Sequence, residues 1–166
     1  MLAIGIDPGT AITGYGLVQR TEPGDLLAVD WGVILTPSDM PPSERLAVIY
    51  HDLNQILQLH HPASAGVESL YFQRNVRTAM SVGQARGVVL LALQQAGIPS
   101  FDYNPNQVKQ AVSGYGAADK GQMQSMVRTL LNLADLPKPD DAADALAVAI
   151  CHHNTQRTAQ MIARQS

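Results

Sequence analysis

The order of strand-like and helix-like segments constrains the fold of this chain more than any other feature. Three strand patterns joined by short turns come first, at Leu2–Asp7, Thr13–Gln19 and Leu26–Thr36. Helical and strand patterns then alternate, with further strands at Ala65–Glu68 and Ile98–Tyr103. An antiparallel meander followed by helix–strand units predicts an α/β fold, a mixed five-stranded sheet with helices on both faces.

Capping and breaking residues set the limits of the helices. We expect helices from Pro42 to just before Pro62, from Asn75 as cap to Ala96, from Asn104 as cap to Gly114, over Lys120–Leu133, and from Asp140 as cap to about His153. The residues from Asn154 onward are polar and are expected to fray. The sequence therefore predicts one domain over 1–155, followed by a polar tail over 156–166.

Composition narrows the compartment and the class of site. The 166 residues contain no apolar run of about 18 residues, so we expect no membrane span. No secretory signal is recognisable, and the single cysteine, Cys151, excludes an internal disulfide and a cysteine-based zinc site. These features predict a cytoplasmic protein.

The formal net charge of −3 at first argues against a nucleic-acid partner. Its distribution is uneven, because residues 74–120 hold five Lys and Arg against two Asp. This basic middle segment can be ordinary solvated surface or a surface that binds an anionic polymer, and the charge pattern alone does not separate the two.

Four acidic residues stand where they could meet. Asp7 and Glu68 each end a strand, and they would lie side by side if the first and fourth strands are neighbours. Asp141 and Asp144 are spaced i, i+3 on an otherwise apolar helix, so both project from one face.

Each acid also has a simpler explanation. Asp7 opens Asp-Pro-Gly-Thr, which is typical of a type II turn, and Asp141 suits the first turn of a helix. Asp144 lies deeper and needs a counter-charge, which neither Lys138 nor Arg128 is placed to supply. Oxygen ligands of this kind suit magnesium or manganese, and two such ions can clamp the reacting oxygens of a phosphodiester. Two histidine pairs could add ligands, but His60 and His61 are typical of a helix end, and His152 and His153 fall in the last turn of the final helix, from which either could assist at the site.

Six stretches together resemble the RuvC family of bacterial Holliday junction resolvases. They are GIDPGT at 5–10, VESLYF at 67–72, GQARGV at 83–88, QVKQAVSGYGAADK at 107–120, MVRTLL at 126–131 and DAADALAVAI at 141–150. The match follows the family's order from end to end, and QVKQ followed by DAADALA is its most specific part.

The resemblance implies a ribonuclease H-like fold and a homodimer that makes paired, symmetric nicks in four-way junction DNA. The family's four metal-binding acids fall on Asp7, Glu68, Asp141 and Asp144, with two Mg²⁺ ions per subunit for which Mn²⁺ substitutes. Its two functional lysines fall on Lys109 and Lys120. Its contact to unpaired bases falls on Tyr71, with Phe72 beside it, and we expect Arg74 and Arg77 of the basic segment to contact DNA as well.

The spacing i, i+4 of Gly83 and Gly87 on the helix at 75–96 suits close approach of another helix, either within the chain or in a second copy. The resemblance implies that this helix forms the interface between two copies. It implies cooperation with the RuvA–RuvB branch-migration complex. The net negative charge departs from the basic character expected of such a nuclease.

Three other functions compete with this one. Asp-x-Gly-Thr after a first strand also opens the phosphate loop of actin-like ATPases and sugar kinases, but those need two such domains. A protein that binds branched DNA without cutting it would not need all four acids. A ribonuclease H-like relative that acts on RNA, such as the YqgF group, is the nearest rival, and the QVKQ and DAADALA stretches favour the resolvase.

Overall fold

A computed structural model describes residues 1–69 and 76–163, and the elements follow the predicted order. The elements are β1 (Leu2–Asp7), β2 (Ile12–Arg20), β3 (Leu26–Leu35), α1 (Pro42–His60), β4 (Ser64–Glu68), α2 (Val76–Gln95), β5 (Ser100–Tyr103), α3 (Pro105–Ser113), α4 (Lys120–Leu130) and α5 (Asp140–Ala163). The strands form one sheet in the order β3-β2-β1-β4-β5. The first three are antiparallel, and β4 and β5 run parallel to β1, which confirms the predicted mixed sheet.

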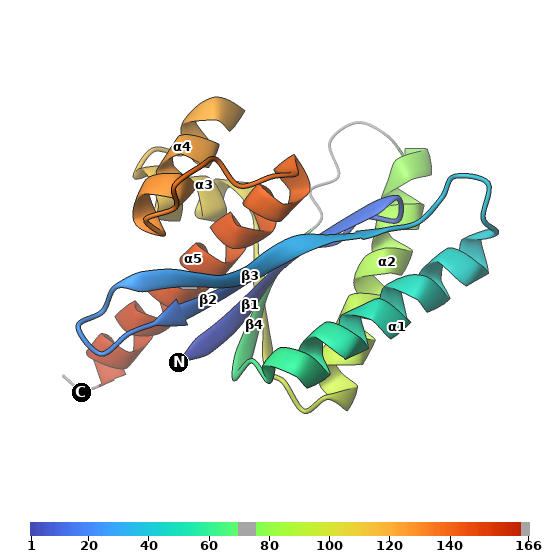
Figure 1. Cartoon of the computed structure of the whole chain (residues 1–166), viewed down its shortest axis with the longest axis horizontal. Coiled ribbons are helices and arrows are strands. Elements are labelled where there is room, and N and C mark those ends of the chain that lie inside the picture. Colours follow the sequence, from blue (N-terminus) through green and yellow to red (C-terminus); the bar gives the residue numbers. More distant parts are fainter. Residues whose placement is uncertain (70–75, 164–166) are drawn as a thin grey trace.

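The sheet separates two apolar cores (Figure 1). On one face, α1 and α2 cover inward-pointing residues such as Ile4, Ile6 and Val67. On the other face, α5 lies against the strands, and α3 and α4 pack on α5. Alternation along each strand sends neighbouring side chains to opposite cores, so both faces of the central strands are buried.

A row of glycines crosses the sheet beneath α5. Gly5 of β1 is paired with Gly16 of β2 and with Gly66 of β4. A Cβ on Gly5 would lie 2.1 Å from the Ala145 carbonyl oxygen, and one on Gly16 would lie 2.8 Å from the Leu146 nitrogen. The helix backbone therefore rests directly on strand backbone, closer than any side chain would allow.

The last helix is longer than the sequence indicates. The prediction that it ends near His153 is wrong, because α5 continues to Ala163. The additional turns are tied to the body of the protein, since Asn154 accepts a hydrogen bond from Arg20 Nη2 at 3.1 Å and donates one to the Ala111 carbonyl at 3.4 Å. The division into a domain over 1–155 and a tail over 156–166 stays a prediction. No helix in 1–69 or 76–163 is both long and apolar enough to cross a bilayer.

The start of α5 also differs from the prediction. Asp140 is not a cap, because the Pro139 carbonyl accepts from the Ala142 and Ala143 amides and the Asp140 side chain faces α4. The turn after β1 is likewise not type II, since Gly9 lacks the positive φ which that turn requires. Gly9 is needed for space, because a Cβ there would lie 2.3 Å from the Ile12 carbonyl oxygen.

Two buried histidines fasten α5 to the sheet. His152 is fully buried, with Nε2 hydrogen-bonded to the Ser64 hydroxyl at 2.7 Å and Nδ1 to the Tyr103 hydroxyl at 2.9 Å. Burial lowers the pKa of His152 to about 4, and the neighbouring His153 adds to the shift. His152 therefore acts as a neutral connector between α5 and strands β4 and β5.

Replacing Gly5 by alanine should destabilise the protein by about 3 kcal/mol, because the new methyl group collides with helix backbone that cannot move away. Urea unfolding of Gly5→Ala measures the loss. Gly121→Ala is the matched control, because its Cβ meets nothing nearer than 3.4 Å. Equal unfolding midpoints for both variants would show that α5 does not depend on this contact.

Acid should destabilise the protein through His152. The ring is neutral in the folded state down to about pH 4, whereas in the unfolded chain it takes up a proton below about 6.5. The unfolded state therefore binds more protons in this window, and stability falls as pH falls, by up to about 3 kcal/mol from this residue. Urea unfolding at pH 7 and pH 4.5 should show a smaller acid-induced loss for His152→Gln than for the unaltered chain; an identical loss would contradict the assignment.

Candidate active site

Asp7 and Glu68 lie side by side at one edge of the sheet. They end the adjacent parallel strands β1 and β4, and they follow Ile6 and Val67, which are paired. A hydrogen bond joins the two carboxyl groups. The sequence-based expectation that the first and fourth strands are neighbours is confirmed.

Helix α5 adds Asp141 and Asp144 to the same edge. The Asp141 carbonyl oxygen lies 2.1 Å from the position of a Cβ on Gly14, and Gly14 is the β2 partner of Asp7. Asp7 is close enough to both α5 carboxylates to repel them, and Glu68 is repelled by Asp144. All four predicted acids therefore belong to one electrostatic cluster.

Two lysines face this cluster across a cavity of about 280 Å³. Glu68, Asp144, Lys109 and Lys120 all line it. The Lys120 ammonium lies 3.7 Å from Asp144 Oδ2 and 3.1 Å from Asp140 Oδ2. The counter-charge of Asp144 is therefore Lys120, the first residue of α4, and not a residue close to Asp144 in sequence.

Crowding of like charges at a half-buried edge perturbs the acids. Burial, followed by repulsion from Asp7, raises the pKa of Glu68 to about 8, and Lys109 partly opposes the shift. Burial also raises the pKa of Asp7 and of Asp144, while Lys120 acts in the opposite direction on both. Among the described residues two lysines face these four acids, and crowded carboxyl groups whose pKa values are raised favour a bound cation in place of their protons.

The donor set fits a hard divalent cation. All the candidate ligands are carboxylate oxygens, which suit Mg²⁺ or Mn²⁺ better than zinc. Within 1–69 and 76–163, however, no three His, Cys, Asp or Glu side chains are already grouped closely enough to hold an ion. Asp7 and Glu68 interact with each other, and Asp144 pairs with Lys120. The carboxylates therefore have the chemistry of a divalent-cation site and lie near one another, but they do not form a preformed cage.

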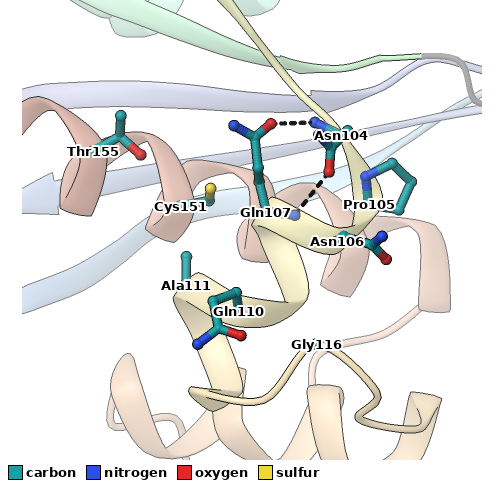
Figure 2. Close-up of a pocket in the computed structure, with 9 residues that line it drawn as sticks. All are labelled: Asn104, Pro105, Asn106, Gln107, Gln110, Ala111, Gly116, Cys151 and Thr155. Atoms are coloured by element: carbon teal, nitrogen blue, oxygen red, sulfur yellow. Dashed lines mark hydrogen bonds between the residues drawn. The ribbon is translucent and has the colours of Figure 1, made fainter.

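A larger cavity of about 1000 Å³ lies on the other side of α3 (Figure 2). The described residues that line it include no carboxylate and no basic side chain; they are Asn104, Pro105, Asn106, Gln107, Gln110, Ala111, Gly116, Cys151 and Thr155. Burial raises the pKa of the Cys151 thiol to about 11, so this cysteine is unreactive. The predicted site residues Glu68, Lys109, Lys120 and Asp144 line the smaller cavity instead.

The structure does not test every predicted site residue. Tyr71, Phe72 and Arg74 lie outside the described residues, and Arg77 belongs to α2 with its side chain not described. His152 and His153 do not line the cavity beside the carboxylates and instead hydrogen-bond within the core. The expectation that they could assist at the site is therefore not supported.

Sequence reasoning missed a contact between α4 and α5. Lys120 Nζ binds Asp140 Oδ2, and Gln124 Nε2 donates to Asp140 Oδ1 at 2.8 Å. Lys120 and Gln124 are spaced i, i+4 on one helix face, and this spacing was the available signal. The contact holds Lys120 beside the carboxylates.

Comparison with known proteins agrees with this geometry. The family model for crossover junction endodeoxyribonuclease RuvC matches residues 3–152. The RuvC of Chloroflexus aggregans is 58% identical over 96% of this chain and 97% of its own length, and that of Desulfitobacterium hafniense (strain DSM 10664 / DCB-2) is 56% identical over 92% of each.

Among solved structures, Thermus thermophilus RuvC in complex with a Holliday junction substrate superposes with a TM-score of 0.87 and 34% identity, covering 95% of this chain and 96% of that one. The predicted ribonuclease H-like fold is confirmed by this likeness and by the sheet order. A match over nine-tenths of the chain, at more than half identical residues, leaves one conclusion: the chain belongs to the RuvC family of crossover junction endodeoxyribonucleases.

Proposed function

We propose that this protein resolves four-way (Holliday) DNA junctions by paired, symmetric, metal-dependent hydrolysis of phosphodiesters, in recombination and repair in the cytoplasm. The observation that carries the proposal is the carboxylate cluster of Asp7, Glu68, Asp141 and Asp144 at one sheet edge, facing two lysines across a cavity. Family membership supports the substrate, because a relative of high structural similarity has been solved with a Holliday junction.

The four carboxylates are the proposed holders of two Mg²⁺ ions per subunit, with Mn²⁺ as a substitute. When bound, such ions polarise the phosphoryl group and stabilise the attacking and leaving oxygens. Asp7 and Glu68 come from rigid central strands, and Asp141 and Asp144 from a helix seated on those strands. Their mutual distances are therefore set by the sheet rather than by a loop, which favours accurate positioning.

Lys109 and Lys120 are the proposed contacts to the scissile phosphate. Both line the cavity together with Glu68 and Asp144, and an ammonium group is a compact neutraliser of phosphate charge. Lys120 is already paired with Asp144, so neutralising Asp144 by other means frees its ammonium for phosphate.

The segment after β4 is the proposed contact for DNA away from the scissile phosphate. We propose that Tyr71, with Phe72, stacks on an unpaired base at the crossover and that Arg74 and Arg77 contact phosphates. Aromatic rings close to a catalytic strand end are suited to stacking on a base that has left the helix.

Two symmetric nicks need two active sites, and each chain has one cluster, so we propose a homodimer. Helix α2 supports this, because Met80 and Leu91 are 71% and 51% exposed and lie on one face, eleven residues or three turns apart. Exposed apolar side chains in line on one helix are typical of an interface. Cooperation with the RuvA–RuvB branch-migration complex is part of the same proposal.

Removing any one site carboxylate should abolish cutting and leave junction binding intact. The changes are Asp7→Asn, Glu68→Gln, Asp141→Asn and Asp144→Asn, which keep shape and reduce the repulsion of phosphate. The measurement compares a synthetic four-way junction with matched linear duplex, with magnesium or with EDTA. Asp135→Asn, an exposed acid outside the cluster, should cut like the unaltered chain. Cutting of both DNA substrates at equal rates, or in EDTA, would disprove the proposed function.

Placing a charge on the face of α2 that carries Met80 and Leu91 should separate the dimer. Leu91→Glu buries a carboxylate against the partner copy if the interface lies there, and sedimentation velocity at micromolar concentration should then show a monomer. Leu59→Glu on α1 is the control, because Leu59 is 74% exposed and lies on another helix. Dissociation by Leu59→Glu alone would move the interface to α1.

A further inference from the structure

A second charged cavity lies at the end of the sheet opposite the carboxylates. It measures about 220 Å³ and is lined by Met1, Arg20, Thr21, Glu22, His153, Gln156 and Arg157. The start of β1, the turn between β2 and β3 and the far part of α5 meet at this end (Figure 1). Since β1 spans six residues at about 3.3 Å each, the cavity lies roughly 20 Å from the carboxylate cluster.

Arg20 brings a fixed positive charge to this cavity. Its Nη1 donates to the Gly24 carbonyl at 2.8 Å and its Nη2 to Asn154 Oδ1 at 3.1 Å. Its Nε is buried and has no hydrogen-bond partner in the part of the chain that the structure describes. No ion pair with a carboxylate forms at Arg20 or Arg157 among those residues, and repulsion from Arg157, after burial, lowers the pKa of Arg20. Two guanidinium groups that lie close together and form no ion pair with any described residue attract an anion, although the exposed Glu22 also lines the cavity.

His153 adds a buried acceptor. The residue is 1% exposed, and its Nε2 donates to the Val18 carbonyl at 2.8 Å, because a carbonyl oxygen can only accept. In the neutral ring Nδ1 then carries the lone pair, and no described residue satisfies it. Both atoms are closed to solvent in the structure, so a ligand reaches them only when the groups that cover them shift, and it must then accept from Arg20 Nε and donate to His153 Nδ1.

We propose that this cavity binds a phosphate group that retains an O–H, which has both acceptor oxygens for the arginines and a donor for His153. Sulfate has equal charge and shape but no proton to donate at neutral pH. A phosphodiester of duplex DNA also lacks the O–H. Inorganic phosphate keeps an O–H at neutral pH, whereas the terminal phosphate of a DNA strand, with its second pKa of about 6, keeps one in only a minor fraction of molecules. Inorganic phosphate is therefore the better match, and a DNA end is the second source of the group.

Glu22 makes the proposal sharper. It is exposed and lines the same cavity, so its carboxylate opposes an anion there. Removing its charge should strengthen phosphate binding, whereas removing the charge of the exposed Arg157 should weaken it. If these two residues only supported the fold, removing their charges would not change the affinity for phosphate in opposite directions.

The test is isothermal titration calorimetry of the full chain with inorganic phosphate at pH 7, in EDTA so that the carboxylate cluster takes no part. Saturable binding is expected, with sulfate at equal ionic strength at least about tenfold weaker. Arg157→Gln should weaken phosphate binding by roughly tenfold and Glu22→Gln should tighten it. Arg128→Gln, an exposed arginine on α4, should behave like the unaltered chain.

Equal affinities for phosphate and sulfate, no saturable binding, or an unchanged affinity in Arg157→Gln would overturn the proposal. Short DNA strands with a 5′-phosphate or a 5′-hydroxyl then identify the source. A preference for the phosphorylated strand that disappears in Arg157→Gln assigns the site to DNA ends; equal binding of both strands, with phosphate binding retained, assigns it to the free ion.

Discussion

The contact between α5 and the glycine row is the constraint on which the rest of the structure depends. Gly5, Gly16 and Gly66 stand side by side on three neighbouring strands, and all three face α5. Because no side chain intervenes, the helix is held at backbone distance. Asp141 and Asp144 at its start are thereby brought within electrostatic reach of Asp7, at the end of the strand that α5 covers. Packing of α5 on these glycines therefore sets the positions of Asp141 and Asp144.

The electrostatics of the site follow from that packing. Four carboxyl groups lie at a half-buried edge, and in the part of the chain that the structure describes Lys109 and Lys120 are the cations that face them. The raised pKa values of Asp7, Glu68 and Asp144 express the imbalance. Asp140, outside the cluster, shares Lys120 with Asp144, so the ammonium group is paired with both carboxylates at once. A site in this condition favours divalent cations without any preformed cage.

The sequence predicts the sheet well, because period-two runs and turn residues are local signals. It also predicts the pairing of Asp7 with Glu68, since parallel strand ends meet at one edge. It misses what depends on distant partners. The end of α5 is misjudged because Asn154 is anchored by Arg20, 134 residues away, and the counter-ion of Asp144 is missed because Lys120 comes from another helix. The sequence did carry a signal for the glycine row. Gly5 and Gly66 each precede an acid by two residues, and residues two apart on a strand lie on the same face of the sheet.

The acidic character of the chain is less of an obstacle to DNA than the net charge of −3 indicates. Four of its fourteen Asp and Glu side chains lie in the carboxylate cluster, where bound cations would cancel them. In their absence the same four acids repel phosphate and Asp144 retains Lys120. Attraction for DNA at this edge therefore depends on the neutralisation of a few defined groups, whereas a uniformly basic surface would attract DNA under all conditions. Under the proposed function, the chain couples its hold on the scissile phosphate to the binding of cations at its own carboxylate cluster.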